Sequence, residues 1–261
     1  MRYLSTLCTP GVHEVEIRAH FKENALYTGD APVFEKPLYL LAFVNRSGSN
    51  LLAEYLRMTP HLRGFREQLI FSTVKQFCTN NSISDFPSYL HAISKAAQDM
   101  GQAYGLKASW DQILMLYRFG VFNMYPAVRV IHIQREDILG QAVSYQIALQ
   151  TKQWTSEHKA TGTQDCRFDA DQISQIIGSV IDGNHLIAQV CTILDLPRVT
   201  VSYENLVAEP GKVIRELAPF TEQDLSKWKP KAPKISKQTS SLNEQFRQEY
   251  LNYARGALQP D

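Results

Sequence analysis

The sequence predicts an α/β fold in which a parallel sheet is flanked by helices. Short apolar runs alternate with helical patterns along most of the chain, which is typical of a parallel sheet. Three runs suit strands that are buried on both faces: 38–44 (LYLLAFV), 128–133 (VRVIHI) and 198–203 (RVTVSY). A fourth segment, 104–110 (YGLKASW), also has the character of a short strand.

Length and composition limit the classes of protein that fit. The 261 residues suit one large domain, or a domain with a small appendage, and 44% hydrophobic residues are ample for a core. A net charge of +1 argues against general nucleic-acid binding, so any anion site must be local. The four cysteines are scattered, without a C-x-x-C pair or clustered histidines, which indicates neither a zinc site nor a disulfide framework. We expect reduced thiols in a cytoplasmic protein.

The first 36 residues lack a clear apolar pattern. His13, Glu14, Glu16 and Arg18 interrupt any run of signal-peptide length. We therefore expect an irregular N-terminal arm over 1–36, which wraps the following domain or closes over a ligand, and a main domain over 37–261. No stretch approaches the apolar length that crosses a bilayer, so no membrane span is expected.

The first strand is followed by a short polar loop and then by a helical pattern over 49–58. The loop residues are Asn45, Arg46, Ser47, Gly48, Ser49 and Asn50. A strand, a tight loop and a helix direct successive backbone N–H groups toward an anion, and the helix N-terminus adds partial positive charge. Gly48 allows a close approach, the two serines supply hydroxyl donors, and Arg46 supplies a permanent cation.

This loop differs from the P-loop of nucleotide triphosphatases. That motif needs a lysine after its second glycine, whereas Ser49 follows Gly48 here, and no glycine lies five residues upstream. Magnesium-dependent phosphoryl transfer would lose its main supports without that lysine. The ordinary alternative is a strand-to-helix turn with a serine cap.

Glu67 follows soon after the loop, once 59–61 (TPH) has ended the first helix. The ordinary interpretation is a surface carboxylate that is solvated or paired with a cation. The functional interpretation is a general base, which must lie within hydrogen-bond reach of a substrate hydroxyl.

The segment between Glu67 and the next buried strand is mostly helical. Residues 71–102 are expected to be helical and linking material, with a turn at 85–88 and an amphipathic helix over 89–100, and a helical pattern resumes at 114–122. Lys107 stands inside the strand-like segment, where a cation is unusual. It either lies at an exposed edge or points into a polar cleft.

Arg135 stands at the end of the strand over 128–133, and Ser144 lies on the helix predicted over 138–154. Ligands of doubly wound sheets bind at the carboxyl ends of the strands. The ordinary alternative is a helix capped by Glu136 and Asp137, with an incidental arginine. Because two strand ends each carry an arginine, we favour a shared anion site.

The last third of the chain continues the alternation. A flexible loop is expected over 152–168, a long helix over 169–194 and a helix over about 209–220. The tail after Lys227 is basic and ends in a short helix that reaches about Tyr253. It is either a solvated cationic tail or a segment that closes over a phosphate.

Several segments together carry a family resemblance. They are R-S-G-S-x-L-L at 46–52, Glu67, G-x-K-x-x-W-[ND]-Q at 105–112, and H-I-x-R-x-D-x-x-x-Q-A-V-S-[FY] with Q-T-x-x-W at 132–154. In addition, V-S-Y-E-N-L-V at 201–207 matches the Y-E-[DN]-L of sulfotransferases generally. In this order, over about 38–220, the chain resembles the PAPS-dependent sulfotransferases of the bacterial trehalose 2-sulfotransferase type.

The resemblance implies a fold, a donor and roles for the site residues. It implies the P-loop-like sulfotransferase fold and 3′-phosphoadenosine 5′-phosphosulfate (PAPS) as donor, with no metal ion. The 5′-phosphosulfate would lie in the loop 46–50 and the 3′-phosphate against Arg135 and Ser144. Glu67 would deprotonate the acceptor hydroxyl, and Arg46 would stabilise the charge on the departing phosphate. Lys107 and Trp110 would line the same cleft, and a homodimer is expected from the family.

The chain also departs from the trehalose type. Asn50 stands where that type has threonine, Ala108 and Ser109 replace larger apolar residues, and the segment before Glu67 differs. These changes lie toward the acceptor side. We therefore expect a small hydroxylated acceptor that is a carbohydrate, a lipid headgroup or a natural product. The alternatives are a nucleotide kinase-like enzyme and a non-catalytic nucleotide-binding protein.

Overall fold

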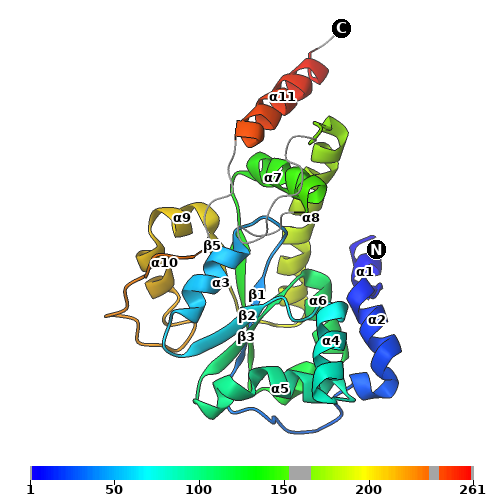
Figure 1. The fold of residues 1–261 in the computed structure, drawn as a ribbon, viewed down its shortest axis with the longest axis vertical. Helices are drawn as coiled ribbons and strands as arrows, with labels where there is room; N and C mark the ends of the chain where they lie inside the picture. Colours follow the sequence, from blue (N-terminus) through cyan, green and yellow to red (C-terminus); the bar gives the residue numbers. More distant parts are fainter. Residues whose placement is uncertain (1, 153–165, 235–240, 260–261) are drawn as a thin grey trace.

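A computed structural model describes residues 2–152, 166–234 and 241–259 (Figure 1). Within these ranges one sheet is formed by β1 (Leu38–Ala42), β2 (Leu62–Arg66), β3 (Ala103–Ala108), β4 (Val128–Gln134) and β5 (Arg198–Ser202). The strand order is β2-β3-β1-β4-β5, and every pairing is parallel. The predicted α/β fold is confirmed, and the four predicted strands are present to within two residues at each end.

Eleven α-helices and two short 3-10 helices surround the sheet in the described residues. The α-helices are α1 (Arg2–Cys8), α2 (Val12–Phe21), α3 (Ser49–Arg57), α4 (Phe71–Asn81), α5 (Phe86–Asp99), α6 (Trp110–Arg118), α7 (Ile138–Thr151), α8 (Ala170–Ile193), α9 (Tyr203–Ala208), α10 (Pro210–Glu216) and α11 (Ser241–Ala257). The 3-10 helices are η1 (Lys22–Ala25) and η2 (Val121–Met124). Most of the loop expected over 152–168 lies outside the described residues. Lys237 of the basic tail also lies outside them.

The sheet separates two hydrophobic layers. Alternate residues of β1 enter opposite layers because successive side chains of a strand point to opposite faces. Leu40 belongs to the cluster that includes residues of α2, α5 and α6, whereas Leu41 belongs to the cluster that includes residues of α3, α9 and α10. A third cluster joins α7 and α8 to α11 through Phe246. In Figure 1, α7 and α11 lie toward the upper end of the molecule, and α8 runs from there toward α6.

Two local expectations need correction. The turn expected at 85–88 is instead the start of α5, because the Asp85 carboxylate accepts a hydrogen bond from the Ser88 N–H (2.7 Å). The helix expected over 114–122 begins earlier, at Trp110, where Ser109 and Gln112 form a capping box. Both differences concern capping side chains rather than the apolar pattern.

Strand β2 has no counterpart among the predicted strands. Its sequence contains two arginines and a glycine, since it lies at the edge of the sheet and pairs only with β3. Its register with β3 shifts between Gly64 and Arg66, and Gly64 and Phe65 have φ values of 87° and 53°. Bulges of this kind redirect the side chains beside them, and Glu67 follows directly.

The expectation of an irregular N-terminal arm is wrong. Helices α1 and α2 and the turn η1 occupy most of residues 2–25, and Ile17 and Phe21 are buried in the core cluster. Glu14 is only 2% exposed, but Arg118 of α6 donates to its carboxylate (2.5 Å). Glu14, one of the charged residues that interrupt the apolar pattern, is therefore buried and paired with Arg118.

Helix α8 departs from the expectation that no stretch could cross a bilayer. By length and composition alone it is long and apolar enough to do so. Its buried residues recur on one side: Ile173, Ile176, Val180, Gly183, Ile187, Val190 and Cys191. They pack in the clusters shared with α6, α7 and α11, as in a core helix.

We predict that Ile17→Ala lowers the free energy of unfolding by about 2–5 kcal/mol, because it removes fully buried apolar volume from α2. Val15→Ala, on the exposed side of the same helix (55% exposed), should change it by less than about 0.5 kcal/mol. Urea unfolding monitored by circular dichroism measures both. Equal stability of the two variants would show that α2 does not contribute to the core.

Candidate active site

The loop after β1 has the backbone of an anion-binding turn. Arg46 and Gly48 have φ values of 64° and 87°, and α3 begins at Ser49 without a side-chain cap. A Cβ on Gly48 would lie 2.2 Å from the Tyr203 ring, so the close approach requires glycine. The Ser47 hydroxyl is buried and has no hydrogen-bond partner among the described residues. These features favour an anion in the loop rather than a plain serine-capped turn.

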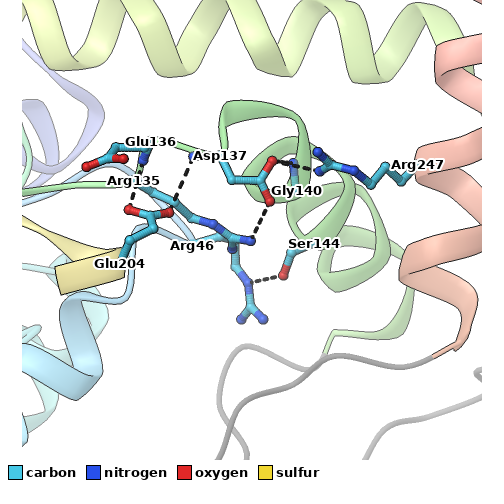
Figure 2. A network of polar contacts seen from close by, with 8 residues as sticks. All are labelled: Arg46, Arg135, Glu136, Asp137, Gly140, Ser144, Glu204 and Arg247. Atoms are coloured by element: carbon cyan, nitrogen blue, oxygen red, sulfur yellow. Dashed lines mark hydrogen bonds and ion pairs between the residues drawn. The ribbon is translucent and has the colours of Figure 1, made fainter. Parts of the chain in front are cut away.

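The loop is joined to the start of α7, which follows the neighbouring strand β4. The Arg46 Nε donates to the Ser144 hydroxyl (3.0 Å, Figure 2). Gln141 donates through Nε2 to the Asn45 carbonyl (2.8 Å), and Asn45 donates through Nδ2 to the Tyr145 hydroxyl (2.9 Å). The ends of β1 and β4 thus form one site.

Arg46 and Arg135 lie close together in this site. Burial lowers the pKa of Arg46, and the positive charge of Arg135 lowers that pKa further. The Arg135 guanidinium lies over the Tyr203 ring (5.2 Å to the centroid), and its buried Nε has no partner in the described part of the chain. Two guanidinium groups beside a buried, unpartnered hydroxyl suit a ligand with more than one negative charge.

Acidic side chains fix the backbone around Arg135 (Figure 2). Asp137 accepts from Arg135 (3.2 Å) and from the Gly140 N–H (3.0 Å), which caps α7. Glu204 accepts from the N–H groups of Glu136 (3.1 Å) and Asp137 (3.3 Å). The acids at 136–137 do belong to the start of the helix, as the ordinary interpretation holds, but the arginine beside them lies close enough to Arg46 to lower its pKa.

Lys107 connects Glu67 to the anion-binding loop. It lies on β3, between β1 and β2, and is 2% exposed. Its Nζ donates to Glu67 (2.5 Å) and to the Asn50 carbonyl oxygen (2.6 Å), and it lies over the Phe43 ring. Lys107 therefore points into a polar site, and the exposed-edge interpretation is wrong. Burial lowers the pKa of Lys107, while the Glu67 carboxylate opposes that effect.

Glu67 is paired with a cation, as its ordinary interpretation proposes. The same cation, Lys107, also donates to Asn50 of the loop, so only the Lys107 side chain separates Glu67 from the loop. Its carboxylate is 45% exposed, so a substrate hydroxyl could reach it. By contrast, Trp110 is partly buried against the hydrophobic cluster on the α6 side.

His132 of the predicted motif has a structural role. It is fully buried, donates through Nε2 to Asn184 (3.0 Å) and accepts at Nδ1 from Arg198 (3.2 Å). Burial lowers its pKa to about 4, so the ring is neutral near pH 7. No group of three metal-ligating side chains occurs among the residues the structure describes.

Several site residues are absent from the predicted set. Tyr203 and Glu204 lie in the V-S-Y-E-N-L-V segment, which signals them only as part of a family motif. Asp137 was interpreted only as a capping acid, although it also contacts Arg135. Arg247 reaches Asp137 from α11 (2.6 Å), and no local pattern indicates a contact between residues 110 positions apart.

A model of the Stf0 sulphotransferase family matches residues 38–252. No curated protein sequence matches the chain.

Three solved structures illustrate the structural similarity. The sulfotransferase domain of the Synechococcus PCC 7002 olefin synthase has a TM-score of 0.54 and 12% identity, covering 87% of this chain and 98% of that chain. A sulfotransferase from Alicyclobacillus acidocaldarius has a TM-score of 0.46 and 14% identity, covering 83% and 92%. Mouse sulfotransferase SULT7A1, complexed with PAP, has a TM-score of 0.43 and 12% identity, covering 93% and 74%. The olefin synthase domain thus shares the fold of this chain. Because the family model matches residues 38–252, most of the chain, the chain belongs to the Stf0 sulphotransferase family and is an enzyme of that family.

Proposed function

We propose that the enzyme transfers the sulfuryl group of PAPS to a hydroxyl of a small polar acceptor. The observation that carries this proposal is the pair of arginines at the ends of two adjacent strands. Arg46 follows β1, Arg135 follows β4, and Arg46 donates a hydrogen bond to Ser144 of α7. A donor with phosphate groups at both its 5′ and 3′ positions needs two cationic subsites close together.

The residues present fit this donor. The loop 46–50 would hold the 5′-phosphosulfate, with the Ser47 hydroxyl as a donor that is buried and otherwise unpartnered in the described chain. Arg135 and Ser144 would hold the 3′-phosphate, and the orphaned Nε of Arg135 is available for it. Both atoms are costly to bury without a partner, and an anionic ligand would satisfy them.

When bound, the donor supplies the sulfuryl group and a bisphosphate leaving group. Glu67 takes the proton of the acceptor hydroxyl while that oxygen bonds to sulfur, and the electron pair of the broken S–O bond leaves with the phosphate. Arg46 and the loop N–H groups stabilise the charge that develops there. Lys107 donates a hydrogen bond to Glu67 and another to Asn50, and so holds the carboxylate in place beside the loop.

The acceptor class follows from the exposed carboxylate and the departures from the trehalose type. Glu67 is open to solvent on one side, and the bulged strand β2 differs in sequence from that type just before it. We therefore propose a carbohydrate, a lipid headgroup or a polar natural product, with no commitment to trehalose.

We predict that adenosine 3′,5′-bisphosphate raises the melting temperature, because a ligand that binds only the folded state stabilises it. Arg135→Ala should weaken this binding about 10- to 100-fold, as it removes charge-assisted hydrogen bonds. Isothermal titration calorimetry measures the affinity, with Arg255→Ala, an exposed arginine on α11, as the control. Stabilisation by ATP with magnesium but not by the bisphosphate would instead support the kinase-like alternative.

We predict that Glu67→Gln binds the bisphosphate as tightly as the wild type but loses about 10²- to 10⁴-fold in turnover, because glutamine cannot accept the proton. Transfer of radiolabelled sulfate from PAPS onto a panel of hydroxylated metabolites provides the measurement. Glu35→Gln, an exposed carboxylate, is the matched control. Undiminished turnover by Glu67→Gln would exclude its role as base.

We predict an alkaline limb in the pH–rate profile that lies below the ordinary lysine pKa of 10.5, because burial lowers the pKa of Lys107 and the charged form is required. Activity should be lost as pH rises through that lowered pKa. Lys107→Arg should move the limb to higher pH, since a guanidinium stays charged, and Lys107→Met should lower the rate at every pH. An unchanged limb in both variants would assign it to another group.

A further inference from the structure

We propose that Arg247, on the C-terminal helix α11, is a positioning residue for the 3′-phosphate and acts through Asp137 on Arg135. The inference rests on the proposed function, in which Arg135 contacts that phosphate. Figure 2 shows the three side chains in a row, with Asp137 between the two arginines and Arg247 reaching in from α11.

The contacts divide the Asp137 carboxylate between two elements. Its Oδ1 accepts from Arg247 Nη1 (2.6 Å) and from the Gly140 N–H (3.0 Å), whereas its Oδ2 accepts from Arg135 Nη2 (3.2 Å). Burial raises the pKa of Asp137, but the hydrogen bonds from Arg247 and Gly140 outweigh burial and hold that pKa below its ordinary value. The carboxylate is therefore charged, and its Oδ1 is shared by Arg247 of α11 and the start of α7.

These contacts of Asp137 determine how many N–H donors of Arg135 remain available for a ligand. Arginine and carboxylate tend to pair through two parallel hydrogen bonds, and such a pairing would occupy two donors of Arg135. Because Arg247 and the Gly140 N–H both donate to Oδ1, Arg135 gives Asp137 a single hydrogen bond at the longer distance of 3.2 Å. Guanidinium has five N–H donors, and the buried Nε of Arg135 is among those that bond to no described residue. Arg247 thus keeps Arg135 turned toward the anion site.

The test compares nucleotides with and without the 3′-phosphate. Calorimetry on the full chain should show that Arg247→Gln binds adenosine 3′,5′-bisphosphate about tenfold more weakly, which corresponds to one charge-assisted hydrogen bond. Binding of adenosine 5′-phosphate should be unchanged. Arg255→Gln, an exposed arginine on the same helix, is the matched control, and Arg247→Lys should recover part of the affinity. In turnover, the KM for PAPS should rise with kcat unchanged.

A double-mutant cycle separates positioning from other roles. In the Arg135→Ala background, Arg247→Gln should cause no further loss of bisphosphate affinity. A further loss there would make Arg247 a direct ligand, and equal weakening of both nucleotides would make it a purely structural clamp; either result overturns the inference. If the wild type fails to bind the bisphosphate, the proposed function fails first, and the inference falls with it.

Discussion

The architecture of the site depends on holding two guanidinium groups together where solvent is partly excluded. Like charges repel more strongly as the surroundings become less polar. Burial lowers the pKa of Arg46, and the positive charge of Arg135 lowers that pKa further. Each guanidinium has a hydrogen-bond partner on α7 or at its start: Arg46 donates to Ser144, and Arg135 donates to Asp137. These partners orient the arginines without fully neutralising them. A polyanionic ligand would relieve the remaining repulsion, which is why we propose a multiply charged donor for this site.

A second charge arrangement lies on the other side of the loop. The ammonium of Lys107 is buried in the sheet, and a buried ammonium favours any neighbour that bears negative charge. Glu67, which directly follows the bulged strand β2, supplies that negative charge, and its side chain remains partly exposed to solvent. The same ion pair therefore stabilises the lysine in the core and holds the carboxylate at the edge of the site. Asn50 couples it to the loop that would bind the sulfuryl donor.

Local patterns in the sequence predict the parts of this site that depend on chain neighbours. The strands over 38–44 and 128–133 and their arginines could be predicted because an apolar run and the polar loop after it are adjacent in the chain. Strand β2 could not, since an edge strand with Arg63 and Gly64 has no apolar alternation. The N-terminal helices were missed because Glu14 is neutralised by Arg118, a distant partner. The Asp137–Arg247 pair was missed for the same reason. The roles of the site residues in binding and catalysis stay predictions.

Asn50 shows how a departure from a family pattern can preserve chemistry. A lysine ammonium only donates hydrogen bonds, so the atom of Asn50 that faces Lys107 at 2.6 Å must be its carbonyl oxygen. That contact fixes the orientation of the amide and turns its NH₂ group away from Lys107. A threonine hydroxyl could accept from the lysine and donate elsewhere through one atom, whereas asparagine divides these tasks between two atoms. The asparagine therefore keeps an acceptor for Lys107, and its NH₂ group is the donor that we propose for the anion.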